Sequence, residues 1–460
     1  MDGLRALLFL LILVTVSRIH QHFRFLAPLR PALLLALLTL LYAMTHPKQL
    51  NTGKLLRFWP PRVIVALAVM ACLSTAFGIS IGGSAMYILT EYSKVLILAF
   101  LLIAAIRSGR DLYRFVWAYV ISAAILCWMA LFVFGISKPR GGAAARLSHL
   151  YTYDANDLGL ILMIALPLTL LAFQVARTKG KIFCAIVLGA IGATVARTGS
   201  RGAFVGAVAV GLALLFLATN VSVVKRVAFL LVVGITLVAT APVGYWDQMM
   251  TITKPKEDYN WTSKYGRREV TKRGFGYMMG HPFFGIGIDN FPRAEGSQMS
   301  SVVRDFQDRT GWHIKWSAAH NSFLQVGAEL GFPGLILWSS LVFGSLFSML
   351  RMRRRLPTTW ARGDPEQRFL YHATTYFPVA IIGFISTSVF LSFAYLDPIY
   401  MLAAFVTGMY VSVERRMRED AAAFVVPGVG GRRGVAGPRP RPQLVPAWRR
   451  QLNARSGTRG

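Results

Sequence analysis

Residues 158–175 read LGLILMIALPLTLLAFQV and contain no charged side chain. A helix of this length rises about 27 Å, which is close to the roughly 30 Å of hydrocarbon in a bilayer. Similar runs recur along the chain, and 55% of its 460 residues are hydrophobic. The sequence therefore predicts an all-α, polytopic membrane protein.

About twelve membrane spans are predicted from these apolar runs. They cover residues 4–19, 27–45, 63–79, 85–106, 115–136, 158–175, 182–196, 203–219, 227–243, 321–350, 374–393 and 396–413.

The spans divide the chain into four parts. Residues 1–243 hold the N-terminal helices, 244–320 form one long polar loop with short helices, and 321–413 hold the C-terminal helices. The basic tail, 414–460, is too poor in apolar residues to form a core, so we expect it to be disordered.

Basic residues explain both the charge and the topology. A net charge of +30 would point to nucleic acid in a soluble protein, but here Lys and Arg gather between apolar runs, so no nucleic-acid partner is expected. The positive-inside rule then places both termini in the cytoplasm and the long loop outside. The three cysteines lie inside apolar runs without the spacing of a metal site.

A short outer turn, RTGSRG at residues 197–202, carries the first candidate site. Arg197, Ser200 and Arg201 cannot move far from the bilayer surface. The glycines allow close backbone approach, and a helix starting here would present N–H groups to a phosphate. Arginine also binds phosphate oxygens bidentately. The alternative is that Arg201 extends to lipid phosphates as an anchor.

The long loop carries the second group of candidates. Arg267 and Arg268 precede a predicted helix, and His320 with Asn321 stands directly before the next apolar run. A lone histidine at a helix start is usually structural. If the arginines lie on the same membrane face, their charge disfavours the imidazolium and leaves a ring that can accept a proton.

Four further polar residues have a structural and a functional interpretation. Asp154 and Asn156 precede the run at 158–175, where they can act as a helix N-cap or contact a substrate. Glu91 and Lys94 lie three positions apart in an apolar run, so they share a helix face and can compensate each other's charge.

Three sequence blocks together resemble the O-antigen ligase and polymerase superfamily. They are TGSRGA at 198–203, GHPFFGIG at 280–287, and AHNSFLQ at 319–325 followed by ELG at 329–331. Residues 154–158 and the helices before them also resemble exosortase-associated O-glycosylation ligases.

The resemblance implies an all-helical glycosyltransferase of the GT-C type, with its site on the periplasmic side of a bacterial inner membrane. It implies an undecaprenyl-diphosphate-linked glycan as donor and neither metal nor nucleotide cofactor. Arg201 and Arg267 correspond to the family's diphosphate-binding arginines, although Arg268 could take the second place. His320 corresponds to its essential loop histidine. Thr271 departs from the aromatic residue that the family often has after the loop arginine.

The expected function is therefore transfer of a glycan from this donor to a hydroxyl of lipid A core or another acceptor. Within the same class, the chain could be a polysaccharide polymerase or a protein O-oligosaccharyltransferase. A flippase or transporter for lipid-linked glycan and a non-catalytic assembly factor are the alternatives from other classes.

Overall fold

The computed structural model describes residues 2–51, 53, 55–137, 145–148, 150, 153–254, 266–297 and 317–423. Its α-helices are α1 (Gly3–Ser17), α2 (Pro31–Thr45), α3 (Trp59–Phe77), α4 (Ile81–Tyr87), α5 (Ser93–Ala105), α6 (Gly109–Trp128), α7 (Ala155–Val175), α8 (Thr178–Thr198), α9 (Arg201–Leu217), α10 (Val223–Thr240), α11 (Tyr245–Met250), α13 (Arg267–Gly280), α14 (Phe291–Ser297), α16 (Ser322–Arg353), α17 (Pro365–Ser388) and α18 (Asp397–Ala423). Short 3-10 helices are η1 (Ile19–His22), η2 (Arg24–Leu29), η3 (Pro47–Gln49) and η8 (Thr358–Arg362), and π-helical turns are η5 (Ile88–Tyr92) and η6 (Met129–Val133). Within these ranges no strand forms, and one isolated antiparallel bridge joins Ile136 to Leu147.

Eight helical segments of the described part are long and apolar enough to cross a bilayer. They confirm the prediction of an all-helical fold with multiple membrane-spanning helices. The other four predicted spans correspond to α18 and to the shorter apolar helices α1, α2 and α9. The number of spans therefore stays a prediction, as do the four-part division and the disorder of the tail, which lies outside the described residues from position 424.

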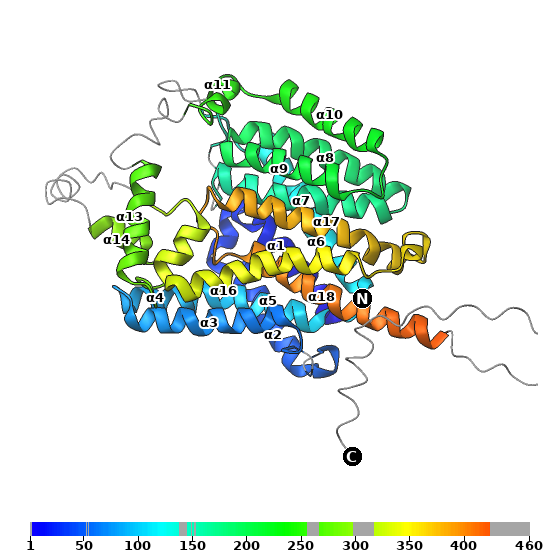
Figure 1. The fold of residues 1–460 in the computed structure, drawn as a ribbon, viewed down its shortest axis with the longest axis horizontal. Helices are drawn as coiled ribbons and strands as arrows, with labels where there is room; N and C mark the ends of the chain where they lie inside the picture. The colour runs from blue at the N-terminus through cyan, green and yellow to red at the C-terminus, as the bar shows by residue number, and fades with distance from the viewer. Residues whose placement is uncertain are drawn as a thin grey trace, which may run out of the picture. The chain divides into compact units, whose positions relative to one another are not determined.

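Small residues bring α7, α9 and α17 into close contact. A Cβ on Gly159 of α7 would lie 2.5 Å from the Ala203 Cβ of α9, and one on Gly206 of α9 would lie 2.5 Å from Cγ2 of Thr387 in α17. Because lipid supplies no hydrophobic drive between helices, such close backbone packing is a main source of association in membranes. Figure 1 shows α7, α9 and α17 side by side. Their contacts make α17 antiparallel to α9, so the end of α17 meets the start of α9.

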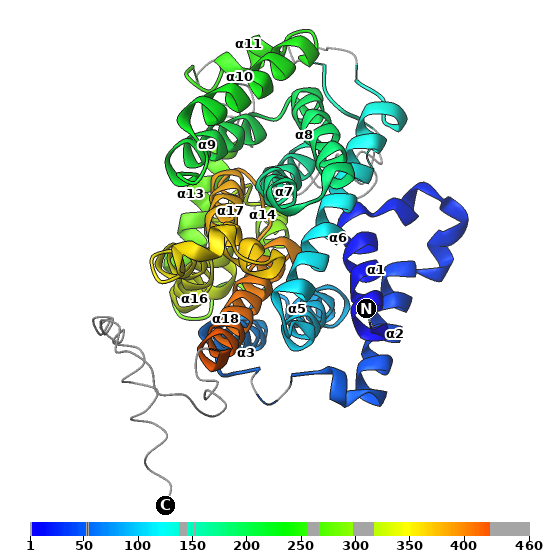
Figure 2. The ribbon, with the colours of Figure 1, turned by 90° about the vertical axis from the view of Figure 1, so that its right-hand side faces the viewer.

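Helices α1 and α2 lie on another side of this group, against α6 and α5 (Figure 2). The buried Arg5 guanidinium of α1 pairs with the Asp111 carboxylate of α6 at 3.0 Å. At the other end of α1, the Tyr153 hydroxyl donates to the Val16 carbonyl at 3.3 Å. These contacts fix both ends of α1.

Helix α16 bends where its hydrogen-bond ladder is broken. Gly331 has a φ of 69°, and Pro333 has no N–H to donate to the carbonyl of Glu329. That carbonyl instead accepts the N–H of Gly287 at 3.1 Å, while the Glu329 carboxylate accepts the N–H of Phe291 at 2.9 Å. The glycine-rich segment before α14, which contains Gly285 and Gly287, is therefore fixed on the bend of α16.

We expect Gly285→Ala to destabilise the protein strongly. Gly285 has a φ of 69°, and a Cβ there would overlap the backbone of Glu329. Gly276 is the matched control, because a Cβ on this helical residue meets nothing within 4 Å. Gly276→Ala should leave the melting temperature in detergent unchanged or raise it slightly, since alanine favours a helix by about 1 kcal/mol. Equal melting temperatures for the two variants would contradict the packing of this segment.

Candidate functional site

The connection between α17 and α18, residues 389–396, organises the candidate site. At one end it packs on the start of α9, where a Cβ on Gly202 would lie 3.1 Å from the Phe390 Cβ. Gly202 directly follows Arg201, the first residue of α9. The connection therefore lies against the N-terminal turn that carries this arginine.

The same connection holds the start of α16. The N–H of His320 donates to the Ser392 Oγ at 3.0 Å. The Ser322 hydroxyl donates to the Leu391 carbonyl at 2.7 Å and accepts the N–H of Phe393 at 2.9 Å. His320 has a φ of 49°, so its backbone turns in the left-handed region just before the helix begins. The half-buried ring is thus presented from a fixed turn.

Helix α13 places Arg267 near this turn. Val270 of α13 is buried in one cluster with Ala319 and Leu324. A Cβ on Gly274 would lie 2.8 Å from Cδ2 of Leu324, so α13 follows the first turns of α16 in the same direction. Its first turn therefore lies at the His320 end of α16.

Arg201 is braced by the segment that follows α10. Its Nη1 donates to the Thr251 hydroxyl at 2.8 Å, and that hydroxyl donates to the Gln248 carbonyl at 2.7 Å. The Gln248 side chain in turn donates to the Gly199 carbonyl at 2.7 Å. This cycle returns to the turn that precedes α9 and limits the directions open to the guanidinium.

Arg201, Arg267 and His320 thus lie at one end of the helix group, where α7, α9, α13 and α16 all begin. The helix dipole places partial positive charge at each of these ends, which the Asp154 cap offsets at the start of α7. Together with the guanidinium groups they form a region suited to an anion. We call this end of the molecule the arginine end.

Several other candidate residues cap helices. Asp154 accepts the N–H groups of Asn156 and Asp157 at 2.6 and 2.8 Å, and the Asn156 amide donates to it at 3.2 Å. Ser200 caps α9, and Asn321 caps α16. The structure thus gives each of these residues a local role, and their contact with substrate stays a prediction.

The remaining arginines differ in surroundings. Arg197 donates from Nη1 to the Leu131 carbonyl at 2.6 Å, which joins the end of α8 to η6. Arg268 is exposed, whereas Arg267 is half-buried and lies on the same face of α13 as Val270. That face packs on α16, so Arg267 is the better placed of the two neighbours.

Sequence reasoning missed the residues that hold the site together. Thr251, Gln248 and Ser392 are common polar residues, and nothing in their spacing relates them to Arg201 or His320. Ser392 even lies inside the predicted span 374–393, so no break in the apolar pattern marked the connection that holds it. These contacts join segments far apart in sequence, so only the fold reveals them.

Asp289, in the segment before α14, makes the stability of the folded protein depend on pH. Burial raises the pKa of its carboxyl from 3.8 to about 6, against the lowering effect of Arg293 and with a further increase from Glu91. The folded state therefore holds this proton more tightly than the unfolded chain. Stability should fall as the pH rises from about 4 to about 6 and then show no further loss from this group.

Asp289→Asn should remove that loss. Asparagine tolerates the φ of 60° at this position, so the backbone is retained. We expect a higher melting temperature than that of the unmodified protein at pH 7.5 and an equal one near pH 4. A lower melting temperature at pH 7.5 would show instead that the carboxylate makes a favourable contact.

The helices form a membrane fold, and the arginine end of this fold is suited to an anionic group near the helix N-termini. Residues 184–339 match the O-antigen ligase family model. The segment runs from α8 to the first half of α16 and includes Arg201, Arg267 and His320. This part of the chain is therefore similar to the O-antigen ligase family, which supports an activity of the ligase or polymerase kind. No curated protein matches the chain.

Proposed function

We propose that the protein is a metal-independent, inverting glycosyltransferase that moves a glycan from undecaprenyl diphosphate to a hydroxyl of lipid A core. The observation that carries this proposal is that residues 389–396 contact both the start of α9, which carries Arg201, and the backbone of His320. Both Arg201 and His320 lie in the segment that matches the family model. We place the site at the periplasmic face of a bacterial inner membrane, in a GT-C fold of about twelve spans with both termini cytoplasmic.

The donor would bind through its diphosphate at the arginine end. Arg201 and Arg267 would hold the phosphate oxygens and stabilise the negative charge that grows as the bond to the sugar breaks. The Thr251 brace supports this role for Arg201, since a guanidinium that is already oriented needs little rearrangement as charge develops.

The acceptor hydroxyl would attack the anomeric carbon from the side opposite to the diphosphate. A carbon–oxygen bond forms to the acceptor, and the bond between the anomeric carbon and the diphosphate oxygen breaks. His320 would take the acceptor proton, and the leaving diphosphate takes the bonding electrons. Support for this role comes from the His320 backbone, which Ser392 holds in a turn open to the same end of the molecule.

Reconstitution with labelled undecaprenyl-diphosphate-linked glycan tests the function. We expect label to appear on added lipid A core, with release of undecaprenyl diphosphate, and no change on addition of a chelator. Growth of glycan chains on the lipid would identify a polymerase instead, and label on protein would identify a protein O-oligosaccharyltransferase. Movement of the glycan across the membrane without release of the carrier would identify a transporter and overturn the proposal.

Arg201→Ala and His320→Asn should each reduce transfer about 100-fold or more, the usual effect of removing a charge-stabilising or proton-accepting group. Asparagine is chosen at position 320 because it tolerates a positive φ, which separates the chemistry of the ring from backbone strain. Lys272→Ala, an exposed change on α13, is the control and should retain activity. A well-expressed and fully active His320→Asn protein would exclude His320 as the base.

A further inference from the structure

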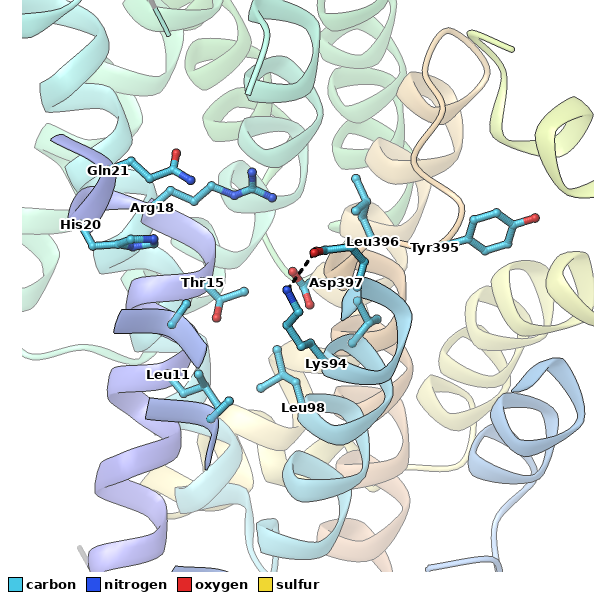
Figure 3. A pocket seen from close by; sticks show the side chains of 14 residues that line it. Leu11, Thr15, Arg18, His20, Gln21, Lys94, Leu98, Tyr395, Leu396 and Asp397 are labelled. Carbon is cyan, nitrogen blue, oxygen red and sulfur yellow. Dashed lines mark hydrogen bonds and ion pairs between the residues drawn. The ribbon is translucent and has the colours of Figure 1, made fainter. Parts of the chain in front are cut away.

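A cavity of about 290 Å³ lies beyond the other end of residues 389–396. It is bounded by α1 and η1, by α2, by the η5–α5 region, and by the start of α18. Figure 3 shows Arg18, Lys94 and Asp397 directed into this space, with Thr15 and Gln21 beside them. A cavity of this size is at the small end for ligand sites, so it fits part of a larger molecule.

The cavity lies at the end of the molecule that we call the arginine end. The Arg18 guanidinium lies over the Tyr153 ring, 4.0 Å from its centroid. Tyr153 directly precedes the Asp154 cap of α7. Asp397 is five residues beyond Ser392, the residue that bonds to the backbone of His320. At most about 17 Å of chain therefore separates Asp397 from Ser392.

The charges of the cavity are balanced, unlike those of the arginine end. Arg18 and Lys94 face Glu91 and Asp397, and the Lys94 ammonium pairs with the Glu91 carboxylate at 3.0 Å. Burial, followed by the charge of Arg18, lowers the pKa of His20, which disfavours a further cation in the cavity. Two carboxylates would repel a diphosphate in this cavity, and no excess of cationic side chains would offset that repulsion.

On the η1 side of the cavity, the Gln21 Oε1 and the His20 Nδ1 are buried and lack a partner among the described residues. A buried amide or ring nitrogen without a hydrogen bond is unfavourable, so such atoms are normally satisfied by water or ligand. In addition, α5 is preceded by the π-helical turn η5, which contains Glu91, and π turns are frequent at functional sites.

We propose that this cavity binds a neutral, hydroxyl-bearing sugar of the acceptor. Sugar hydroxyls both donate and accept, which matches a lining of carboxylates, an amide, a hydroxyl and two cations. Asp397 accepts hydrogen bonds from hydroxyls of this sugar, while Arg18 and Lys94 donate to its oxygens. The inference rests on the proposed glycosyl transfer.

The order of contacts along residues 389–397 assigns the cavity to the acceptor rather than to the donor. Phe390 lies against the Arg201 turn, Ser392 holds His320, and Asp397 lines the cavity. Helix α9 packs on α7 and α17, whereas α1 packs on α2, α5 and α6 (Figure 2). An in-line displacement needs the attacking hydroxyl opposite the leaving diphosphate, and the cavity is lined by elements other than those that carry Arg201 and Arg267.

Cysteine protection tests the assignment without requiring turnover. Gln21→Cys is placed in a Cys72→Ser background, since Cys72 is exposed and the other two cysteines are buried. We expect rough lipopolysaccharide, which ends in a sugar core, to slow labelling of this cysteine by a maleimide at least fivefold. Undecaprenyl diphosphate should leave the rate unchanged. Lys272→Cys on α13 is the control for general shielding by lipid, and Thr15→Cys repeats the test from α1.

Protection by undecaprenyl-diphosphate-linked glycan alone would assign the cavity to the donor and overturn the inference. Absence of protection at both cavity cysteines, or equal protection of the control, would also overturn it. As a kinetic check, Asp397→Asn should raise the KM for lipid A core about tenfold and change the KM for the donor less than twofold. Failure of transfer by the unmodified protein would instead reject the proposed function, and the labelling rates would still report on the cavity.

Discussion

The close packing of α7, α9 and α17 against one another is the constraint on which the site depends. It requires glycine at the crossing points, since Cβ atoms on Gly159, Gly206 and Gly383 would each come within 2.5 Å of an atom of the neighbouring helix. In a bilayer, backbones that approach closely gain dispersion energy and weak hydrogen bonds which side chains of ordinary size would prevent. Because α17 is fixed in this way, the connection that follows it reaches both the start of α9 and the start of α16.

That connection separates two regions of different electrostatic character. On one side lie helix N-termini and the guanidinium groups of Arg201 and Arg267, an arrangement in which positive charge accumulates. On the other side lies the cavity with equal numbers of cationic and anionic side chains. The N–H of His320 bonds to Ser392 in this connection, between Phe390 and Asp397 along the chain. A main-chain hydrogen bond therefore sets the backbone position of His320.

The apolar runs predicted most helices closely, because a span must be apolar over most of its length. The prediction at 158–175 agrees with α7, which ends at Val175. The start of α17 was missed by nine residues. Its first turns contain Asp364 and Gln367 in a capping box and the buried Glu366, so they are polar although helical. Likewise α18 continues to Ala423, past the predicted end at residue 413.

The sequence by itself determined the helical membrane class, the approximate spans, and which residues carry charge next to them, because hydrocarbon imposes a length and a composition on every crossing segment. The sequence also identified Arg201, Arg267 and His320 as candidate site residues, because short sequence blocks resemble those of a known family. Only the tertiary structure decided that these residues share one end of the molecule, that Asp154 and Asn321 cap helices, and that Thr251 and Ser392 orient the site. Such contacts depend on distances between segments remote in the chain, and no local pattern encodes them.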